Sequence, residues 1–525
     1  MNVLVTDPIN ERGIDRLRDT GHDIRTEYDL ETDELLEAVA DIHALVVRSG
    51  TEVTREVIEA APELIIIGRA GIGTDNIDED AATEHGVIVA NAPQGNVRAA
   101  AEHTVAMTFA AARWIPQADR RLRAGDWAKS EFIGMELNGK TLGIVGLGRV
   151  GQEVARRLGD LGMEIVAYDP YISADRAESL GAELVDFETC LDRADVVSVH
   201  VPLTPETEGL IGAAELERLE DGLVINCSRG SVVDEDALAA AVSSGSVRGA
   251  ALDVFSEEPL PADSPLLEVD DIVVTPHLGA STEAAQENVA TSIADQVIAA
   301  FDGEPVVNAL NAPSIDERAF PRLRPFIDLA TEAGRIATQL LDDRIERVTV
   351  EYLGEIADED VDLVTASALM GVFEPLEWQV NAVNAPRLAE ERGVEVTESK
   401  RRSAEDFTDL IRIRVGDADQ ELTVEGTLFA GNDPRIVRID GYRVDAIPAG
   451  HMLICRNRDR PGILGLIGTA LGENEINIAG MFNSRESSGG EAMTVYNLDD
   501  PVPQDLIERL ESDERIISAR YITLN

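Results

Sequence analysis

The stretch TLGIVGLGRVGQEVARRL, residues 141–158, decides the fold of this chain. A short apolar run leads through the glycine pattern GLGRVG at 146–151 into a segment of helical character. The next apolar run, MEIVAYD at 163–169, ends on the acidic residue Asp169. A strand that enters a helix through GxGxxG, with an acid after the following strand, is typical of dinucleotide-binding domains. The segment therefore predicts a Rossmann-type domain built on a parallel sheet.

Each position of this motif has a separate physical task. Gly146 permits the tight turn, Gly148 lets the backbone approach a pyrophosphate, and Gly151 lets the helix pack closely on the strand. The start of the helix offers unpaired N–H groups and the positive end of its dipole to the phosphates. Asp169 is expected to accept hydrogen bonds from a ribose and to repel a 2′-phosphate, which favours NAD over NADP.

Apolar runs alternate with helical sequence on both sides of the motif, which predicts an α/β chain with parallel sheets. The run of helical sequence at 282–305 should return the chain to its first domain, so we expect the nucleotide domain to be inserted in a flavodoxin-like substrate domain. An α+β intervening domain and a β-α-β-β-α-β domain of ferredoxin-like type are expected to follow. The expected bounds are 1–96 with 285–313, 97–284, 316–445 and 450–525.

The charge of the chain is its unusual feature. Asp and Glu number 99 against 45 Lys and Arg, a net charge of −54, and the only lysines are Lys129, Lys140 and Lys400. Acids spread along the whole chain repel nucleic acid and anionic membranes, and concentrated salt screens their mutual repulsion. We expect a protein adapted to a salt-rich cytoplasm; the alternative is a merely acidic mesophilic enzyme.

The cysteines and the N-terminus point to a reducing compartment. Cys190, Cys227 and Cys455 are far apart in the sequence, so we expect neither a disulfide framework nor a metal site. The N-terminal sequence has no basic segment followed by an apolar one, and no apolar run reaches the length of a membrane span. A cytoplasmic protein without a secretory signal is expected.

Three side chains of complementary chemistry follow successive strands of the predicted nucleotide domain: Arg229, Glu258 and His277. Because the carboxyl ends of parallel strands open on one edge, these side chains can converge there. Oxidation of a secondary alcohol needs a base near neutrality, an acid that orients it, and a cation that binds a substrate carboxylate and polarises the neighbouring carbonyl.

Other roles for these residues stay open at this point. Arg229 can be a structural arginine at a strand end, Glu257 can replace Glu258, and His277 can be a core histidine bonded to backbone. His200 also ends a strand, but on the half of the sheet where the dinucleotide lies, so we expect a structural or cofactor-side role for it.

The whole chain resembles the D-isomer-specific 2-hydroxyacid dehydrogenases. The similarity lies in GRAGIGTDNID (68–78), the segment 136–158, NCSRGSVVDEDAL (226–238), GAALDVFSEEP (249–259) and PHLGAST (276–282), and the C-terminal sequence resembles an ACT domain. The resemblance is to the long, ACT-containing members and implies NAD-dependent oxidation of 3-phospho-D-glycerate to 3-phosphooxypyruvate, the first step of L-serine synthesis. It implies Arg229, Glu258 and His277 as catalytic residues. It also implies cofactor contacts at Ile72, Gly146, Gly148, Arg149, Val150, Gly151, Asp169, Val201, Cys227, Ser228, Asp253 and Gly279, with Ile72 and Val201 standing where relatives have Thr.

A phosphorylated substrate needs local cations in so acidic a protein. We expect Arg48 and Arg69 to bind its phosphate or carboxylate beside Gly71 and Asn96; both arginines can instead be solvated strand-end residues. A cluster of four cations can add positive potential or be a solvated helix face: Arg120, Arg121, Arg123 and Lys129.

For the C-terminal domain, the resemblance implies L-serine as an effector held between paired domains by Asn457, Asp459 and Asn477. The alternative is an assembly domain that binds no ligand. A homo-oligomer, dimer or tetramer, is expected because the hinge helices and the edges of the ACT domain offer self-complementary surfaces.

Three other functions compete with phosphoglycerate oxidation. A glyoxylate or hydroxypyruvate reductase uses the same chemistry, and a substrate panel distinguishes it. A non-enzymatic, NAD-sensing protein that binds partners has the same fold, but the corepressors of that kind have no ACT domain. A pure amino-acid sensor does not need the catalytic set.

Overall fold

A computed structural model describes residues 1–313, 315, 319–341, 344–376, 379–404, 406–417, 420–485 and 487–524. The first sheet is parallel throughout, in the order β2-β1-β3-β4-β5 of flavodoxin-like folds. Its strands are β1 (Asn2–Val5), β2 (Asp23–Thr26), β3 (Ala44–Val47), β4 (Ile66–Arg69) and β5 (Ile88–Asn91). The helices that cover it are α1 (Glu11–Arg18), α2 (Thr32–Ala38), α3 (Arg55–Glu59), α4 (Glu79–Glu84) and α12 (Glu283–Phe301).

The second sheet has the order β12-β11-β10-β9-β6-β7-β8 and is also parallel throughout, as a doubly wound dinucleotide fold requires. Its strands are β6 (Thr141–Val145), β7 (Glu164–Tyr168), β8 (Glu183–Leu184), β9 (Val196–Val199), β10 (Leu223–Asn226), β11 (Gly249–Leu252) and β12 (Ile272–Val274). Its helices are α5 (Val97–Ala112), α6 (Ile115–Arg123), α7 (Arg149–Asp160), α8 (Ala174–Ser179), α9 (Phe187–Arg193), α10 (Ala213–Arg218) and α11 (Glu235–Ser244), with 3-10 turns η1 (Gly230–Val232) and η2 (Pro265–Glu268).

The C-terminal half contains two further sheets, in the orders β14-β13-β15-β16-β17-β18 and β20-β21-β19-β22. The first comprises β13 (Arg347–Gly354), β14 (Glu395–Arg401), β15 (Asp409–Gly416), β16 (Glu421–Phe429), β17 (Asp433–Ile439) and β18 (Tyr442–Ala446), with α13 (Phe320–Leu340), η3 (Glu355–Asp358), α14 (Asp362–Phe373) and α15 (Ala385–Glu391). The second comprises β19 (Gly450–Arg458), β20 (Ile478–Arg485), β21 (Glu491–Leu498) and β22 (Ile516–Leu524), with α16 (Ile463–Glu473) and α17 (Gln504–Glu511). The predicted α/β fold class with an α+β unit and a ferredoxin-like unit is thereby confirmed.

Two strands escaped the sequence analysis. β2 has the sequence DIRT, with one apolar residue and no fully buried one, so it shows no apolar run. β8 consists of only two residues at the edge of the second sheet. The other strands of both parallel sheets, β1, β3 to β7 and β9 to β12, lie inside apolar runs of the sequence or within a residue of them. These runs are 3–7, 44–49, 64–71, 86–92, 141–146, 163–169, 196–203, 222–228, 250–255 and 271–276. The expected start of the intervening domain at residue 316 and the last residue, 525, lie outside the described residues.

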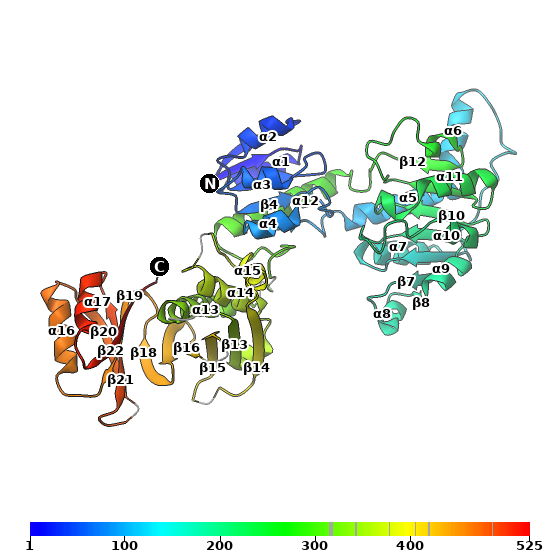
Figure 1. Ribbon diagram of the computed structural model, residues 1–525. Coiled ribbons are helices and arrows are strands. Elements are labelled where there is room, and N and C mark those ends of the chain that lie inside the picture. Colours follow the sequence, from blue (N-terminus) through cyan, green and yellow to red (C-terminus); the bar gives the residue numbers. More distant parts are fainter. Residues whose placement is uncertain are drawn as a thin grey trace.

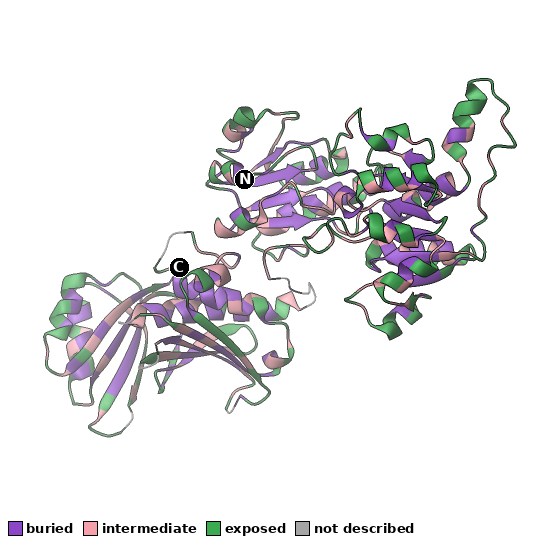
Figure 2. Ribbon diagram, turned by 45° about the vertical axis from the view of Figure 1, so that its right-hand side comes forward, coloured by how far each residue is buried: buried purple, intermediate pink, exposed green. Residues whose placement is uncertain are grey.

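Figure 1 shows the two parallel-sheet lobes with the long helices α5 and α12 between them, and the third and fourth sheets following on one side. α12 packs against α1 and β4 of the first lobe, whereas α5 packs against α7, β10 and β11 of the second. Figure 2 shows buried strands between helices whose outer faces are exposed. Among the described residues, no helix is both long and apolar enough to cross a membrane. The fold therefore places the carboxyl edges of two parallel sheets on either side of one cleft.

The packing of α12 on the first lobe depends on a glycine in α1. A Cβ at Gly13 would lie 2.7 Å from the carbonyl oxygen of Ala290, so the two helices touch through their backbones. Gly13→Val should therefore lower the free energy of unfolding of the first lobe by about 1–3 kcal/mol through overpacking. Chemical denaturation followed by far-ultraviolet circular dichroism measures the change in the free energy of unfolding.

The matched control is Gly468→Val in α16, where a Cβ would meet nothing within 4 Å. Both substitutions replace a helical glycine by the same β-branched residue, so helix propensity cancels between them. Equal stability of the two variants would contradict the close packing of α1 on α12.

Candidate active site

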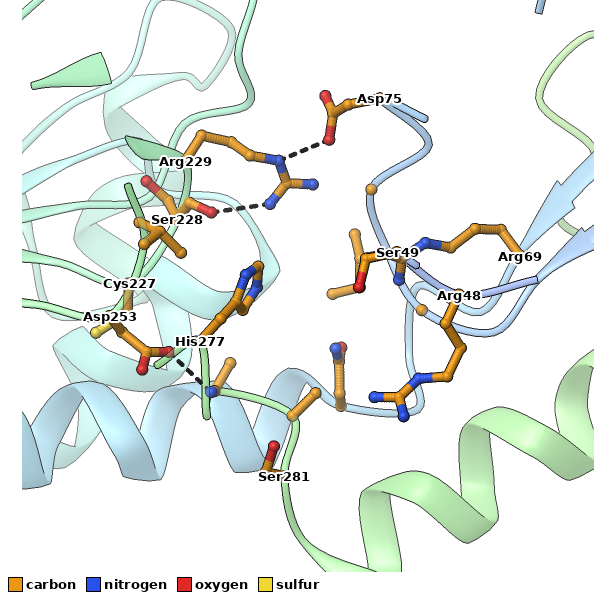
Figure 3. A pocket seen from close by; sticks show the side chains of 18 of the residues that line it. Arg48, Ser49, Arg69, Asp75, Cys227, Ser228, Arg229, Asp253, His277 and Ser281 are labelled. Carbon is orange, nitrogen blue, oxygen red and sulfur yellow. Dashed lines mark hydrogen bonds and ion pairs between the residues drawn. The ribbon is translucent and has the colours of Figure 1, made fainter. Parts of the chain in front are cut away.

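A cleft of about 880 Å³ lies between the two lobes, and the loops that follow the strands of both sheets line it. Figure 3 shows Arg229 and His277 entering it from the second lobe, and Arg48 and Arg69 facing them from the first. All three predicted catalytic residues and all four predicted substrate residues line this cleft. They are Arg229, Glu258 and His277, with Arg48, Arg69, Gly71 and Asn96.

His277 and Glu258 form a hydrogen-bonded pair at the carboxyl edge of the second sheet. The Nδ1 atom of His277 lies 2.7 Å from Oε2 of Glu258, whose other oxygen accepts a hydrogen bond from the Phe255 amide at 3.0 Å. Burial would raise the pKa of Glu258, but the hydrogen bond and charge of His277 outweigh it and lower that pKa below its usual value. Glu258, and not Glu257, lines the cleft. With Nδ1 engaged, Nε2 is the ring nitrogen left to face a substrate.

Asp253 holds the loop that carries His277. His277 has a φ of 52°, in the left-handed region that side chains other than glycine rarely adopt. The carboxylate of Asp253 fixes this turn by accepting hydrogen bonds from the amides of Leu278 and Gly279, both at 2.8 Å. Its Oδ1 atom also accepts a hydrogen bond from Thr275 Oγ1 at 2.5 Å and lies 3.1 Å from Nε2 of His103. Burial would raise the pKa of Asp253, but these hydrogen bonds lower it overall.

Arg229 extends from the end of β10 across the cleft. Its Nε donates to Oδ2 of Asp75 at 2.9 Å and its Nη1 donates to the carbonyl of Ser228 at 2.8 Å. The guanidinium lies against the backbone of Gly73, where a Cβ would stand 1.7 Å from Nη2. Asp75 is a cleft residue that the sequence analysis missed; its one signal is its place in the loop after β4, next to the predicted Arg69.

The first lobe contributes two more cations to the same space. Arg69 is half-buried, and burial followed by the charges of Arg229 and Arg48 lowers its pKa to about 10. Its Nε atom has no hydrogen-bond partner among the described residues, and neither does the buried Oδ1 of Asn96. A cluster of mutually repelling guanidinium groups beside unpaired polar atoms is suited to an anionic ligand.

The glycine motif has the geometry that a dinucleotide requires. Gly146 has a φ of 94°, and a Cβ at Gly151 would lie 2.2 Å from the Gly146 carbonyl, so turn and helix meet through backbone. A Cβ at Gly148 would meet nothing within 4 Å, which leaves the space that a pyrophosphate would fill. Oδ2 of Asp169 accepts the Leu147 amide at 2.8 Å, so the acid is fixed beside the glycine turn. These residues fit an NAD molecule.

The other predicted cofactor residues line the cleft and connect the glycine turn to His277. They are Ile72, Arg149, Val150, Val201, Cys227, Ser228, Asp253 and Gly279. Burial raises the pKa of Cys227 to about 12, so its thiol is neutral. Burial lowers the pKa of His200 to about 4, and its Nε2 lies 2.8 Å from Ser198 Oγ. A neutral imidazole hydrogen-bonded to Ser198, on the strand β9 that His200 directly follows, suits a structural or cofactor-side role and not proton transfer.

The predicted cationic cluster does not line the cleft. Its arginines lie on α6 and pair with acids there: Arg120 with Asp270 at 3.1 Å, and Arg123 with Asp119 at 2.7 Å. Arg121 pairs with Asp126. The three arginines are thus paired with acids, and none of the four cations, Lys129 included, lines the cleft of the same chain.

A second pocket, of about 460 Å³, lies in the ACT domain. Asn457 and Asp459 line it, and Asn457 is 2% exposed with an Oδ1 that has no partner among the described residues. Asp459 accepts hydrogen bonds from Arg485 at 2.8 Å and the Gly489 amide at 2.9 Å. Asn477 does not line this pocket; its side chain donates to Asp499 at 2.6 Å. The structure thus brings together two of the three predicted effector residues.

Asp253→Asn should destabilise the nucleotide domain by about 1–3 kcal/mol, because the amide cannot accept from all the donors that face it. The pKa of the Asp253 carboxyl is lowered in the folded state, so its contribution is complete above the unfolded pKa of about 3.9 and disappears as pH falls through the lowered value. Thermal melts should show that the melting temperature of the variant lies below that of the wild type by a constant difference from about pH 8 to 5. This difference should narrow at lower pH.

The exposed Asp263 supplies the control for that series, since Asp263→Asn removes a carboxylate from the same region without buried donors. A gap for Asp253→Asn no larger than that of Asp263→Asn would refute the assigned network.

Comparison with known proteins agrees with this geometry. The sequence matches the D-isomer specific 2-hydroxyacid dehydrogenase NAD binding domain over residues 105–279, the D-3-phosphoglycerate dehydrogenase intervening domain over 322–440, and the ACT domain over 451–515. The chain is 45% identical to the D-3-phosphoglycerate dehydrogenase of Archaeoglobus fulgidus, with 100% of both chains covered. It is 43% identical to that of Methanocaldococcus jannaschii over the same shares.

Among solved structures, D-lactate dehydrogenase from Aquifex aeolicus, complexed with NAD and lactic acid, aligns with a TM-score of 0.55 at 27% identity. The alignment covers 60% of this chain and 100% of that one. The chain belongs to the D-isomer-specific 2-hydroxyacid dehydrogenase family, among the long members that carry an intervening domain and an ACT domain.

Proposed function

We propose that this chain catalyses the NAD-dependent oxidation of 3-phospho-D-glycerate to 3-phosphooxypyruvate, the first step of L-serine synthesis. The observation that carries the proposal is the convergence of the His277–Glu258 pair with Arg229 in a cleft that also holds Arg48 and Arg69. The full-length relatives named D-3-phosphoglycerate dehydrogenase support the choice of substrate.

The residues divide the chemistry among them. Nε2 of His277 takes the proton of the 2-hydroxyl group, and the Glu258 carboxylate holds the tautomer and stabilises the resulting imidazolium. Arg229 binds the substrate carboxylate and stabilises the charge that builds on the neighbouring oxygen. Arg48 and Arg69 bind the phosphate from the first lobe. NAD, when bound, accepts the hydride from C2.

The glycine motif and Asp169 hold the adenosine half of the cofactor in this proposal, and Ile72 and Val201 contribute apolar or backbone contact. The residues from Cys227 to Gly279 that line the cleft surround the nicotinamide end. Asp253, which fixes the His277 loop, thereby links the base to the cofactor pocket.

The test is NADH formation from 3-phosphoglycerate in concentrated KCl, the medium that screens a net charge of −54. We expect turnover of 3-phosphoglycerate well above that of D-glycerate or glycolate, because only 3-phosphoglycerate has a phosphate for Arg48 and Arg69. Preference for glyoxylate or hydroxypyruvate in the reverse reaction would favour the reductase alternative instead.

We further propose that L-serine binds in the ACT pocket through Asn457 and Asp459. Asn477 precedes β20, one of the two edge strands of the ACT sheet, so a second copy paired along that edge would supply it. A cytoplasmic homo-oligomer is the corresponding assembly. Exposed apolar side chains on α6 and the segment that follows it support a second contact between copies of the chain: Ile115, Leu122, Trp127 and Ile133.

His277→Ala should lower kcat by about 10²–10⁴-fold, the share of a general acid–base group, with little change in NADH binding. Steady-state kinetics and NADH fluorescence titration measure the two effects. The control is His22→Ala, since His22 packs edge-on against Phe301 with ring centroids 4.9 Å apart, outside the residues that line the cleft. A near-wild-type kcat for His277→Ala would remove this residue from its proposed role.

Asp169→Ala should weaken the preference for NAD over NADP by about tenfold or more in kcat/KM, because the repulsion of a 2′-phosphate is lost. The ratio of kcat/KM for the two cofactors is the measurement, taken at one fixed KCl concentration. The control, Asp175→Ala in α8, removes a carboxylate from the same region of the domain. An unchanged ratio would show that another group selects the cofactor.

A further inference from the structure

One contact of the cleft is left without a role by the chemistry above. Asp75, in the loop between β4 and α4, reaches across from the first lobe and pairs with Arg229 of the second. Figure 3 shows this pair on the side of the cleft opposite Arg48. The two side chains are 57% and 28% exposed, so the pair contributes little to stability and its significance lies in orientation.

The loop that presents Asp75 is fixed on both sides. Asn76 donates through Nδ2 to the carbonyl of Arg48 at 2.8 Å, and Asn91 donates to the carbonyl of Ile72 at 2.6 Å. Asp78 caps α4 by accepting the Ala81 amide at 2.8 Å. The carboxylate of Asp75 is therefore held at a defined place on the wall of the cleft.

The guanidinium of Arg229 has five N–H donors, and the structure accounts for two of them. Nε is taken by Asp75 and one hydrogen of Nη1 by the Ser228 carbonyl, while the Nη2 end of the group lies against the backbone of Gly73, where a side chain would have no room. Within the described part of the chain, the other Nη1 hydrogen and the Nη2 hydrogens have no hydrogen-bond partner, and one hydrogen from each of these nitrogens forms the fork that binds a carboxylate in two-pronged fashion. Asp75 thus occupies the edge of the guanidinium that the substrate does not need.

Asp75 also changes the charge balance among the three arginines. Arg48 and Arg69 have no acidic ion-pair partner among the described residues, whereas Arg229 does. The negative charge of Asp75 favours the protonated state of Arg69, and the charge of Arg229 disfavours it. One carboxylate thereby separates the roles of the cations, leaving Arg48 and Arg69 free for the phosphate and Arg229 held at the reacting end.

We propose that Asp75 is a positioning residue for Arg229: from the opposite lobe it fixes the guanidinium with its free fork toward the carboxylate and 2-hydroxyl of the substrate. The proposal rests on the proposed function, because it assigns the orientation of the arginine that acts on this substrate. The pair joins the two lobes, so the orientation of Arg229 depends on the closure of the cleft.

The test is a double-mutant cycle on the full-length chain in concentrated KCl. Asp75→Ala should lower kcat for 3-phosphoglycerate by about 10–100-fold, the cost of misplacing a group by about 1 Å, while NADH binding by fluorescence titration stays within about twofold of wild type. Asp75→Asn keeps an acceptor oxygen without the charge, so its kcat should lie between those of the wild type and Asp75→Ala. In an Arg229→Lys background, which lacks Nε and the fork, Asp75→Ala should cost no more than about twofold.

A second readout separates orientation from phosphate binding. The loss caused by Asp75→Ala should be the same for 3-phosphoglycerate and for phosphate-free D-glycerate, because Arg229 is assigned to the end that both share. Arg48→Ala, in contrast, should affect only the phosphorylated substrate. The control Glu52→Ala removes an exposed carboxylate that lines the same cleft and has no ion pair among the described residues; it should leave kcat within about twofold.

Wild-type kcat in Asp75→Ala and Asp75→Asn would overturn the proposal, and so would an equal loss in the Arg229→Lys background. A larger loss for 3-phosphoglycerate than for D-glycerate would also overturn it, by assigning Asp75 to phosphate binding. A wild-type chain that forms no NADH from 3-phosphoglycerate would remove the proposed function and this inference together. An active wild type with unaffected Asp75 variants would remove the inference alone.

Discussion

The site depends on one constraint: parallel strands direct all their carboxyl ends to the same edge, and here two such edges face each other. In the second lobe, β10, β11 and β12 are neighbours in the sheet, so the loops that carry Arg229, Glu258 and His277 emerge side by side. In the first lobe, β3 and β4 are neighbours and deliver Arg48 and Arg69. The helices α5 and α12 hold the two edges on either side of one cleft. This arrangement alone brings the catalytic residues and the arginines of the first lobe together.

Positive charge is concentrated in the cleft, whereas the chain as a whole is strongly negative. The protein has a net charge of −54, and the arginines of α6 are paired with acids of their own surface. In the cleft, burial together with the positive charges of Arg229 and Arg48 lowers the pKa of Arg69 to about 10. An acidic chain therefore contains a local concentration of positive charge that suits a phosphorylated, carboxylated substrate.

The sequence alone predicted the strands that are buried and apolar, and the residues that follow them, because both features are local. It missed β2 and β8, since the first has only one apolar residue in its DIRT sequence and the second is only two residues long. It left Glu257 and Glu258 undecided, because only the distance to His277 separates two adjacent acids. Asp75 is one of 99 acidic residues and acquires its significance from a partner 154 positions away. Asn477 shares its residue type with Asn457, but their separation within the ACT domain depends on tertiary structure.

The central claim is that His277, Arg229 and the arginines of the first lobe bind one substrate in a single pose. The most direct test is a crystal structure of the chain with NADH and 3-phosphoglycerate grown from concentrated KCl. The account predicts the 2-hydroxyl within hydrogen-bond distance of His277 Nε2, the carboxylate on the fork of Arg229, and the phosphate on Arg48 and Arg69. A substrate bound with its phosphate on Arg229, or with its hydroxyl turned away from His277, would contradict it.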